Sequence, residues 1–255
     1  MRQLLDHTIY LAHRAFKVDH VAKLTFTDNR IRPAELQKMC ASALLIRALH
    51  KAHSINLLTK EGLLEEAEII LRVLLEVSFV VGAVTKTPQF TARYGVSSFV
   101  ERRRRVKAFL RATECFDGIP GVTPSIIKNA KKQIEAYDAA IKQLNAKALR
   151  IVDYAKEAGL LADYYSSYSE LCSSVHSGPE DLEAYFHKDS SGKLVAIGPT
   201  AKSNAEILLA TAIEAMVRIL KATSTVFGFS IMELAEVERL RKQVMAILWG
   251  RRSAS

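Results

Sequence analysis

The chain has 255 residues, of which 49% are hydrophobic and 25% are charged, and its formal net charge is +9. This length allows one sizeable hydrophobic core, and the composition, with only 11 glycines and 6 prolines, suits a helical globule better than a β-sandwich or a disordered chain. The three widely spaced cysteines form no Cys-x-x-Cys pair, so they indicate neither a disulfide framework nor a zinc knuckle and favour a reducing cytoplasm.

Membrane signals are weak along the sequence. The N-terminal stretch carries charges throughout and lacks the apolar run and cleavage site of a signal peptide. The longest apolar window, residues 69–84, is interrupted by Arg72 and Glu76 and is shorter than the roughly 20 residues that span a bilayer. We therefore expect a cytoplasmic protein without a membrane span. Its positive charge favours nucleic acid as a partner, although many basic proteins bind none.

Apolar residues recur at spacings of three and four along most of the chain, which predicts an all-α bundle of seven to nine helices. The first four helices are expected over residues 3–17, 33–58, 60–86 and 88–116. Pro33 and Pro88 stand where a helix can begin, because the first helical residue needs no N–H partner. The third helix is apolar on most sides, which is typical of a central helix surrounded by its neighbours.

The second half of the chain continues the helical pattern with one interruption. Thr123 and Pro124 are expected to start a helical pair that ends near Ala158, with Gly159 closing it. A helix over residues 161–175 follows. Residues 184–197 place a polar turn between two β-forming segments, which predicts a small hairpin. Helices over 200–227 and 230–249 complete a single helical domain, residues 1–255.

A helix at 161–175 would carry chemically active side chains at helical spacing. Tyr165, Tyr168, Cys172 and His176 follow steps of three and four, so two phenols, a thiol and an imidazole are expected on one face. His176 could transfer a proton while Tyr168 orients a substrate. The alternative is a structural helix end, in which the histidine contacts terminal carbonyls and the tyrosines pack in the core.

The third helix contains a charged pair, Arg72 and Glu76, at the i, i+4 spacing on an otherwise apolar surface. Burying this helix would bury both charges, which costs several kcal/mol unless they are paired and hydrogen-bonded. Such a pair indicates a structural lock or a functional site, and a solvent-facing stripe is a third interpretation.

These two helices carry a resemblance to a known group of proteins. Ala67, Arg72 and Glu76, followed by Tyr165, Ser169 or Cys172, and His176, are similar to the motifs of uncharacterised bacterial proteins related to the HEPN (higher eukaryotes and prokaryotes nucleotide-binding) domains. The resemblance covers residues 40–187. It implies a helical bundle, frequent dimerisation and membership of a superfamily that includes many metal-independent RNases of toxin–antitoxin and antiviral systems.

The chain departs from the HEPN pattern at one point. Active HEPN nucleases carry an arginine shortly before the catalytic histidine, and no arginine lies within ten residues before His176. Three other stretches have the required spacing: Arg2 to His7, Arg14 to His20, and Arg47 to His53. Chance alone predicts one or two such matches. Arg47 and His53 lie on a helix expected to pack near Arg72 and form an alternative site.

An arginine run, ERRRRVKAFLR, lies on the fourth helix. Its side chains point in different directions around the helix, so at least one face is in solvent. The functional interpretation is a phosphate-contacting patch that binds nucleic acid without reading sequence. The alternative is a solvated face balanced by nearby glutamates. The residues of the patch are Arg102, Arg103, Arg104, Arg105, Lys107 and Arg111.

The sequence suggests neither a metal nor a cofactor, since no ligand set completes the pair His50 and His53 and no glycine-rich phosphate loop is present. The resemblance implies an RNA- or nucleotide-directed protein of bacterial defence or toxin type, with a metal-independent endoribonuclease as its enzymatic form. In such an endoribonuclease, Arg72 would stabilise the charge on the phosphate, and Glu76 would keep the Arg72 side chain in place. The alternative is a non-catalytic scaffold or partner-binding module. An apolar C-terminal helix suggests a homodimer.

Overall fold

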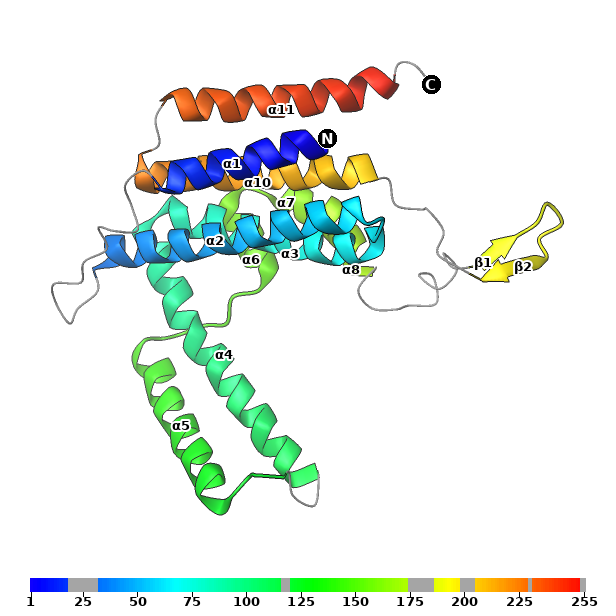
Figure 1. Cartoon of the computed structure of the whole chain (residues 1–255). Helices are drawn as coiled ribbons and strands as arrows, with labels where there is room; N and C mark the ends of the chain where they lie inside the picture. The colour runs from blue at the N-terminus through cyan, green and yellow to red at the C-terminus, as the bar shows by residue number, and fades with distance from the viewer. Residues whose placement is uncertain (18–31, 116–119, 174–185, 198–204, 229–230, 253–255) are drawn as a thin grey trace.

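The computed structural model describes residues 1–17, 32–115, 120–173, 186–197, 205–228 and 231–252. Within these residues the chain forms nine helices and one two-stranded sheet, which confirms the predicted all-α class with a small hairpin (Figure 1). The first five helices are α1 (Arg2–Lys17), α2 (Pro33–Lys60), α3 (Leu64–Lys86), α4 (Pro88–Cys115) and α5 (Pro124–Gln143). They are followed by α6 (Ile151–Ala158), α7 (Leu161–Asp163), a π-helical turn (Tyr164–Tyr168), α8 (Ser169–Ser173), α10 (Ala205–Phe227) and α11 (Ile231–Arg252). Because α7, the π turn and α8 follow without a gap, they form one helix.

The central helix of the bundle is α3, as its apolar character predicts. It packs against α2, α10 and α6, and its side chains Leu74, Phe79, Val81 and Val84 are fully buried. Figure 1 shows α1 lying over α10, with α11 as the outermost layer beyond α1. Removing the apolar surface of these helices from water is the main term that stabilises the bundle.

Helix ends follow local chemistry that the sequence already contains. The backbone N–H of Ile126 donates to Thr123 Oγ1 at 3.4 Å, and Pro124 is the first residue of α5. Gly159 ends α6 in the left-handed conformation, with a φ of 75°, which costs glycine little because it has no Cβ. The predicted helical pair at 124–158 is therefore confirmed, with a break between Gln143 and Ile151.

A second glycine sets the distance between two helices. A Cβ atom added at Gly82 of α3 would lie 2.8 Å from the Cβ of Ala158 on α6. Only glycine allows the two backbones to approach this closely. The contact brings α6, and with it the helix that follows, onto α3.

The helices α4 and α5 form a hairpin that extends away from the bundle (Figure 1). We call residues 88–147, which hold these two helices, the arm. The buried residues of α4 are Phe90, Thr91 and Ser97, all in its first half, where it packs against α2 and α3. Beyond them α4 pairs with α5, in which Ala130 is buried. The bundle therefore anchors one end of the arm and leaves the rest in solvent.

The predicted hairpin is formed by β1 (Phe186–Lys188) and β2 (Leu194–Ile197), which pair antiparallel. Its turn is held by Asp189, whose Oδ1 accepts hydrogen bonds from the backbone N–H groups of Ser191 and Lys193. These bonds, led by one from the Ser191 hydroxyl, lower the pKa of Asp189. Gly192 supplies the positive φ, 81°, that the turn requires.

None of the helices in the described ranges contains a segment long and apolar enough to cross a membrane.

Candidate functional site

The Arg72 and Glu76 side chains of α3 meet the helix that contains the π turn. Arg72 Nη2 lies 3.1 Å from Glu76 Oε1, as the i, i+4 spacing predicts. Arg72 also donates from Nε to Cys172 Sγ at 3.3 Å and from Nη2 to the Tyr168 hydroxyl at 3.4 Å. The Tyr168 hydroxyl in turn donates to Glu76 Oε1 at 2.8 Å. We call these four residues the polar cluster.

The polar cluster is half-buried. The Arg72 and Glu76 side chains are 23% and 25% exposed, whereas Tyr168 is only 6% exposed. Burial, followed by the neighbouring Glu76 carboxylate, raises the pKa of Tyr168 well above its usual range. Burial acts to lower the pKa of Arg72, but its bonds to Cys172 and Tyr168 outweigh this and raise the pKa. The phenol therefore stays protonated as a donor, and Glu76 neutralises the guanidinium.

The π turn decides which tyrosines enter the core. The rings of Tyr164 and Tyr168 stack with centroids 5.3 Å apart, and Phe79 of α3 lies 6.4 Å and 5.7 Å from them. Tyr165 is 70% exposed. The prediction that Tyr165 shares a face with Tyr168 is therefore wrong. A π turn contains about one residue more than an α turn, so the register before it shifts by one position.

The remaining predicted site residues are His176, Arg47 and His53. His176 lies outside the described residues. Arg47 and His53 are both exposed on α2, and six residues of α-helix separate their directions by about 120°. Neither forms a hydrogen bond or ion pair with the polar cluster. The structure thus brings Arg72, Glu76 and Tyr168 together and does not bring Arg47 and His53 to them.

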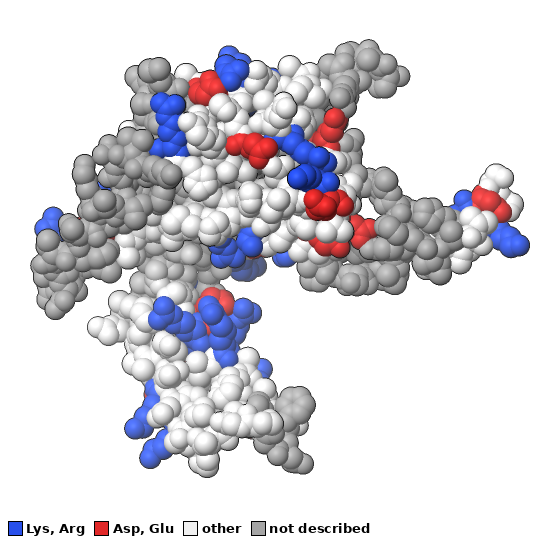
Figure 2. Space-filling view, viewed as in Figure 1, with Lys and Arg blue, Asp and Glu red and all other residues white. Residues whose placement is uncertain are grey.

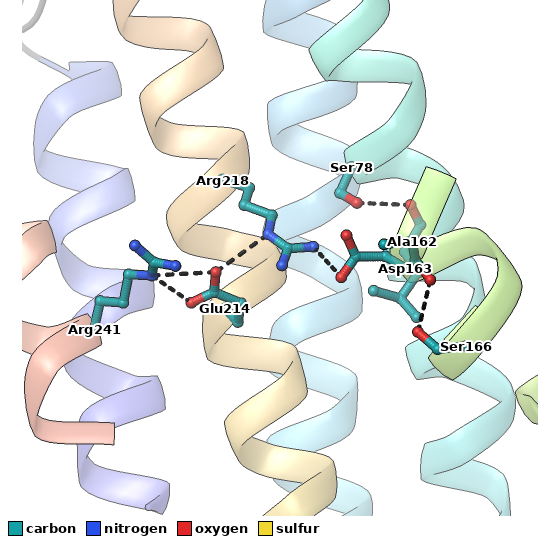
Figure 3. Close-up of polar contacts among 8 residues, drawn as sticks. Ser78, Ala162, Asp163, Ser166, Glu214, Arg218 and Arg241 are labelled. Carbon is teal, nitrogen blue, oxygen red and sulfur yellow. Dashed lines mark hydrogen bonds and ion pairs between the residues drawn. The ribbon is translucent and has the colours of Figure 1, made fainter. Parts of the chain in front are cut away.

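A second charged network joins α7, α10 and α11 (Figure 3). Arg218 contacts Asp163 Oδ1 from Nη1 at 2.7 Å and Glu214 Oε1 from Nε at 3.2 Å. Arg241 reaches the same Glu214 at 2.9 Å. This network was not predicted from the sequence, although Glu214 and Arg218 have the same i, i+4 spacing on an apolar helix as Arg72 and Glu76. Ser166 completes this corner by donating to the Ala162 carbonyl at 2.8 Å.

The arginine run lies on the arm, where its members have different partners. Arg103 forms an ion pair with Asp138 of α5 at 2.6 Å, and Arg104 forms one with Glu101 at 2.8 Å. The other cations of the predicted patch have no ion-pair partner among the described residues: Arg102, Arg105, Lys107 and Arg111. Figure 2 shows lysines and arginines gathered along the arm with few carboxylates between them.

An open groove of about 480 Å³ follows one side of α4. Its lining consists of Val100, Arg103, Arg104, Lys107, Ala108 and Arg111, so four of its six residues are cationic. A second groove, of about 370 Å³, lies between α4 and α5 and includes Phe109 and Ile126. The rings of Phe99 and Tyr137 pair across the two helices at 6.3 Å. Phe99, Phe109 and Tyr137 thus serve the contact between the two helices of the arm.

Among the described residues, no three His, Cys, Asp or Glu side chains come together as a group that could hold a metal ion.

Residues 38–194 match the model of a family of unknown function, DUF5677. The chain belongs to this family. The matched region contains the polar cluster and the whole arm. Comparison with curated proteins and with solved structures finds no significant match.

Proposed function

We propose that this DUF5677 chain is an RNA-directed protein whose arm binds the phosphate backbone. The observation that carries the proposal is the distribution of charge. The arm contains twelve lysines and arginines and five aspartates and glutamates, a net charge of +7. The remaining 195 residues contain 24 basic and 22 acidic residues, a net charge of only +2.

Like charges on a narrow element repel one another, so this concentration of cations destabilises the fold unless an anionic partner binds to it. Two of the arginines, Arg103 and Arg104, are compensated within the protein. The remaining exposed cations lie on the solvent side of a helical hairpin that the bundle does not cover (Figure 2). Phosphates of nucleic acid are the polyanion that lysine and arginine contact most often without reading sequence.

A binding measurement tests this proposal. The full chain is titrated onto a fluorescent RNA at increasing salt, and we expect affinity to fall steeply with salt because counterions are released. The double variant Arg102→Gln, Arg105→Gln should weaken binding at least several-fold, whereas Lys38→Gln, Lys60→Gln on α2 should leave it nearly unchanged. Absence of binding at 50 mM salt, or equal effects of the two double variants, would overturn the proposal.

The finer function we propose is that of a HEPN-like, metal-independent endoribonuclease of bacterial defence or toxin type. The ribose 2′-OH would attack the adjacent phosphorus and the bond to the 5′-oxygen would break. His176 would transfer the proton from the 2′-OH to the leaving 5′-oxygen. Arg72 would stabilise the charge that develops on the phosphate, and Tyr168 would orient the substrate. The arrangement in which Glu76 holds Arg72 while a quarter of each side chain stays exposed supports these roles.

Cleavage of defined RNAs in EDTA tests the enzymatic proposal. We expect products ending in a 2′,3′-cyclic phosphate from the wild-type chain, and loss of cleavage in His176→Ala and Arg72→Ala. Circular dichroism confirms that each variant is folded. A folded His176→Ala variant that cleaves at the wild-type rate would exclude His176, and an inactive wild type would leave RNA binding without cleavage.

The alternative function is a non-catalytic scaffold that binds a protein partner, such as an antitoxin or another defence component. It is favoured by the mutual satisfaction of the polar cluster, in which Arg72, Glu76 and Tyr168 use one another as partners. In this case Arg72→Ala would lower the melting temperature of the protein, and the RNA would not be cleaved. A homodimer is a further proposal, and a monomeric mass in light scattering would exclude it.

A further inference from the structure

The two outer sides of the arm carry separate rows of cations. On α4, Arg104, Lys107 and Arg111 follow one another at steps of three and four residues along the groove of about 480 Å³. At 1.5 Å per residue this row is about 10 Å long. Glu101 and Glu114 lie on the same helix, and Glu101 compensates Arg104. The row still presents a net positive edge to solvent.

The row on α5 consists of lysines. Ile126, Asn129, Ala130 and Gln133 line the groove toward α4. Four exposed lysines take other directions around the helix and point away from α4: Lys128, Lys131, Lys132 and Lys142. The single exposed glutamate among them, Glu135, leaves this edge cationic. From Lys128 to Lys142 the row is about 21 Å long.

The two rows face opposite sides of the hairpin. Val106 and Phe109 of α4 line the groove toward α5, whereas the α4 row lines a different groove on the same helix. Packed helices lie about 8–10 Å apart, and side chains extend from both, so the rows are on the order of 20 Å apart. An arm of this width with two cationic edges is suited to contact two phosphate backbones at once.

We infer that the arm binds double-stranded RNA, lying along the minor groove with the α4 row on one strand's phosphates and the α5 row on the other's. This inference rests on the proposed RNA-directed function. The minor groove of A-form RNA is wide and shallow, and proteins recognise it through phosphates and 2′-hydroxyls. The minor groove of B-form DNA is only about 6 Å wide, and its edges carry no 2′-hydroxyls.

The aromatic side chains of the arm argue against single-stranded RNA. Proteins that bind single strands stack bases on exposed aromatic rings. In the described part of the arm Phe99 and Tyr137 pair with each other, Phe109 lines the groove between the helices, and Phe90 and Tyr94 lie against Tyr154 of α6. A single strand also has one backbone, which would engage one row and leave the other unused.

Fluorescence anisotropy with three probes tests the inference on the full chain: an 18-base-pair RNA duplex, one of its strands alone, and a DNA duplex of the same sequence. We expect the RNA duplex to bind at least tenfold more tightly than either of the others at 150 mM salt. Tighter or equal binding of the DNA duplex would overturn the A-form assignment, and equal binding of the single strand would overturn the duplex assignment.

Three triple variants, each of which removes three positive charges, separate the two edges. The α4-edge variant carries Arg104→Gln, Lys107→Gln and Arg111→Gln. The α5-edge variant carries Lys128→Gln, Lys131→Gln and Lys132→Gln. The control, on the bundle, carries Lys38→Gln, Lys60→Gln and Lys156→Gln.

Each edge variant should weaken duplex RNA binding by roughly tenfold or more, because phosphate contacts are lost. The salt slope should fall by about 3 for the α5 edge and by about 2 for the α4 edge, where Arg104 is already paired with Glu101. The control variant should change the affinity for duplex RNA and the salt slope by only a small fraction of these amounts. An effect confined to one edge would overturn the two-strand arrangement while leaving the RNA-directed function standing. Failure of all three probes to bind at 50 mM salt would remove the RNA-directed function itself.

Discussion

The Tyr168 hydroxyl donates a hydrogen bond to Glu76 Oε1 at 2.8 Å, joining residues 92 positions apart in the chain. The bond fixes the π turn against α3, and the same carboxylate also pairs with Arg72. A buried phenol is therefore the link between the central helix of the bundle and the helix that leads toward His176.

Replacing Tyr168 with phenylalanine tests this link. The change removes the donor to Glu76 and the acceptor for Arg72 without removing the ring, and a hydrogen bond to a charged group contributes about 1.5–3 kcal/mol. We expect Tyr168→Phe to lower the free energy of unfolding by about 2 kcal/mol in urea titrations. The matched control is Tyr165→Phe, whose ring is 70% exposed and should change stability by less than about 0.5 kcal/mol. Equal effects at the two positions would contradict the assigned register.

The Arg72–Glu76 pair should show coupling in a double-mutant cycle. Removing either partner leaves a half-buried charge without compensation, whereas removing both removes that cost. We expect Arg72→Met and Glu76→Gln each to be destabilising. The double variant should be less destabilising than the sum of the two single variants by about 1 kcal/mol. This value is modest because about a quarter of each side chain is exposed. Strict additivity of the two changes would show that the ion pair contributes nothing.

The close contact between α3 and α6 predicts that replacing two different glycines with alanine has different effects on stability. Gly82→Ala places a Cβ 2.8 Å from Ala158, so the helices must separate, at a cost of about 1–3 kcal/mol. Ala158→Gly in the same chain should restore part of that loss. Gly95→Ala is the control, because its nearest neighbour is the flexible end of Leu36 at 3.5 Å and alanine favours the helix by about 0.5–1 kcal/mol. Thermal unfolding that ranks the two single variants in the opposite order would refute the contact.

The contact between α1 and α11 should become less stabilising at acid pH, because it includes the Glu236 carboxylate. Hydrogen bonds from Arg239 and from His7, which lies 3.0 Å away, lower the pKa of Glu236 to about 2. Because the folded-state pKa is below that of the unfolded chain, the stabilisation is fully present above about pH 4.5 and is lost as the pH falls toward 2. Unfolding midpoints measured from pH 6 to 2 should show a difference between wild type and Glu236→Gln that shrinks over this window. A difference that is constant with pH would exclude the carboxylate as its source.

Much of the fold could be predicted from the sequence because helix boundaries depend on neighbouring residues. Pro33, Pro88 and Thr123 begin helices where predicted, and Gly159 ends one, since each acts on backbone groups within one turn. The hairpin at 186–197 follows from its turn residues in the same way. The charge of the arm is likewise a property of composition, and so is the i, i+4 pairing of Arg72 with Glu76.

Tertiary structure decided which distant side chains meet. Nothing near Arg72 in the sequence specifies Tyr168 or Cys172 as its partners, because these contacts cross 96 and 100 positions and depend on how α3 and the π turn pack. The π turn also turned Tyr165 out to solvent, against the regular helical period, since packing of Tyr164 and Tyr168 on Phe79 outweighs the local preference for an α turn. The projection of the basic arm from the bundle was set in the same way, because the buried residues of α4 all lie in its first half.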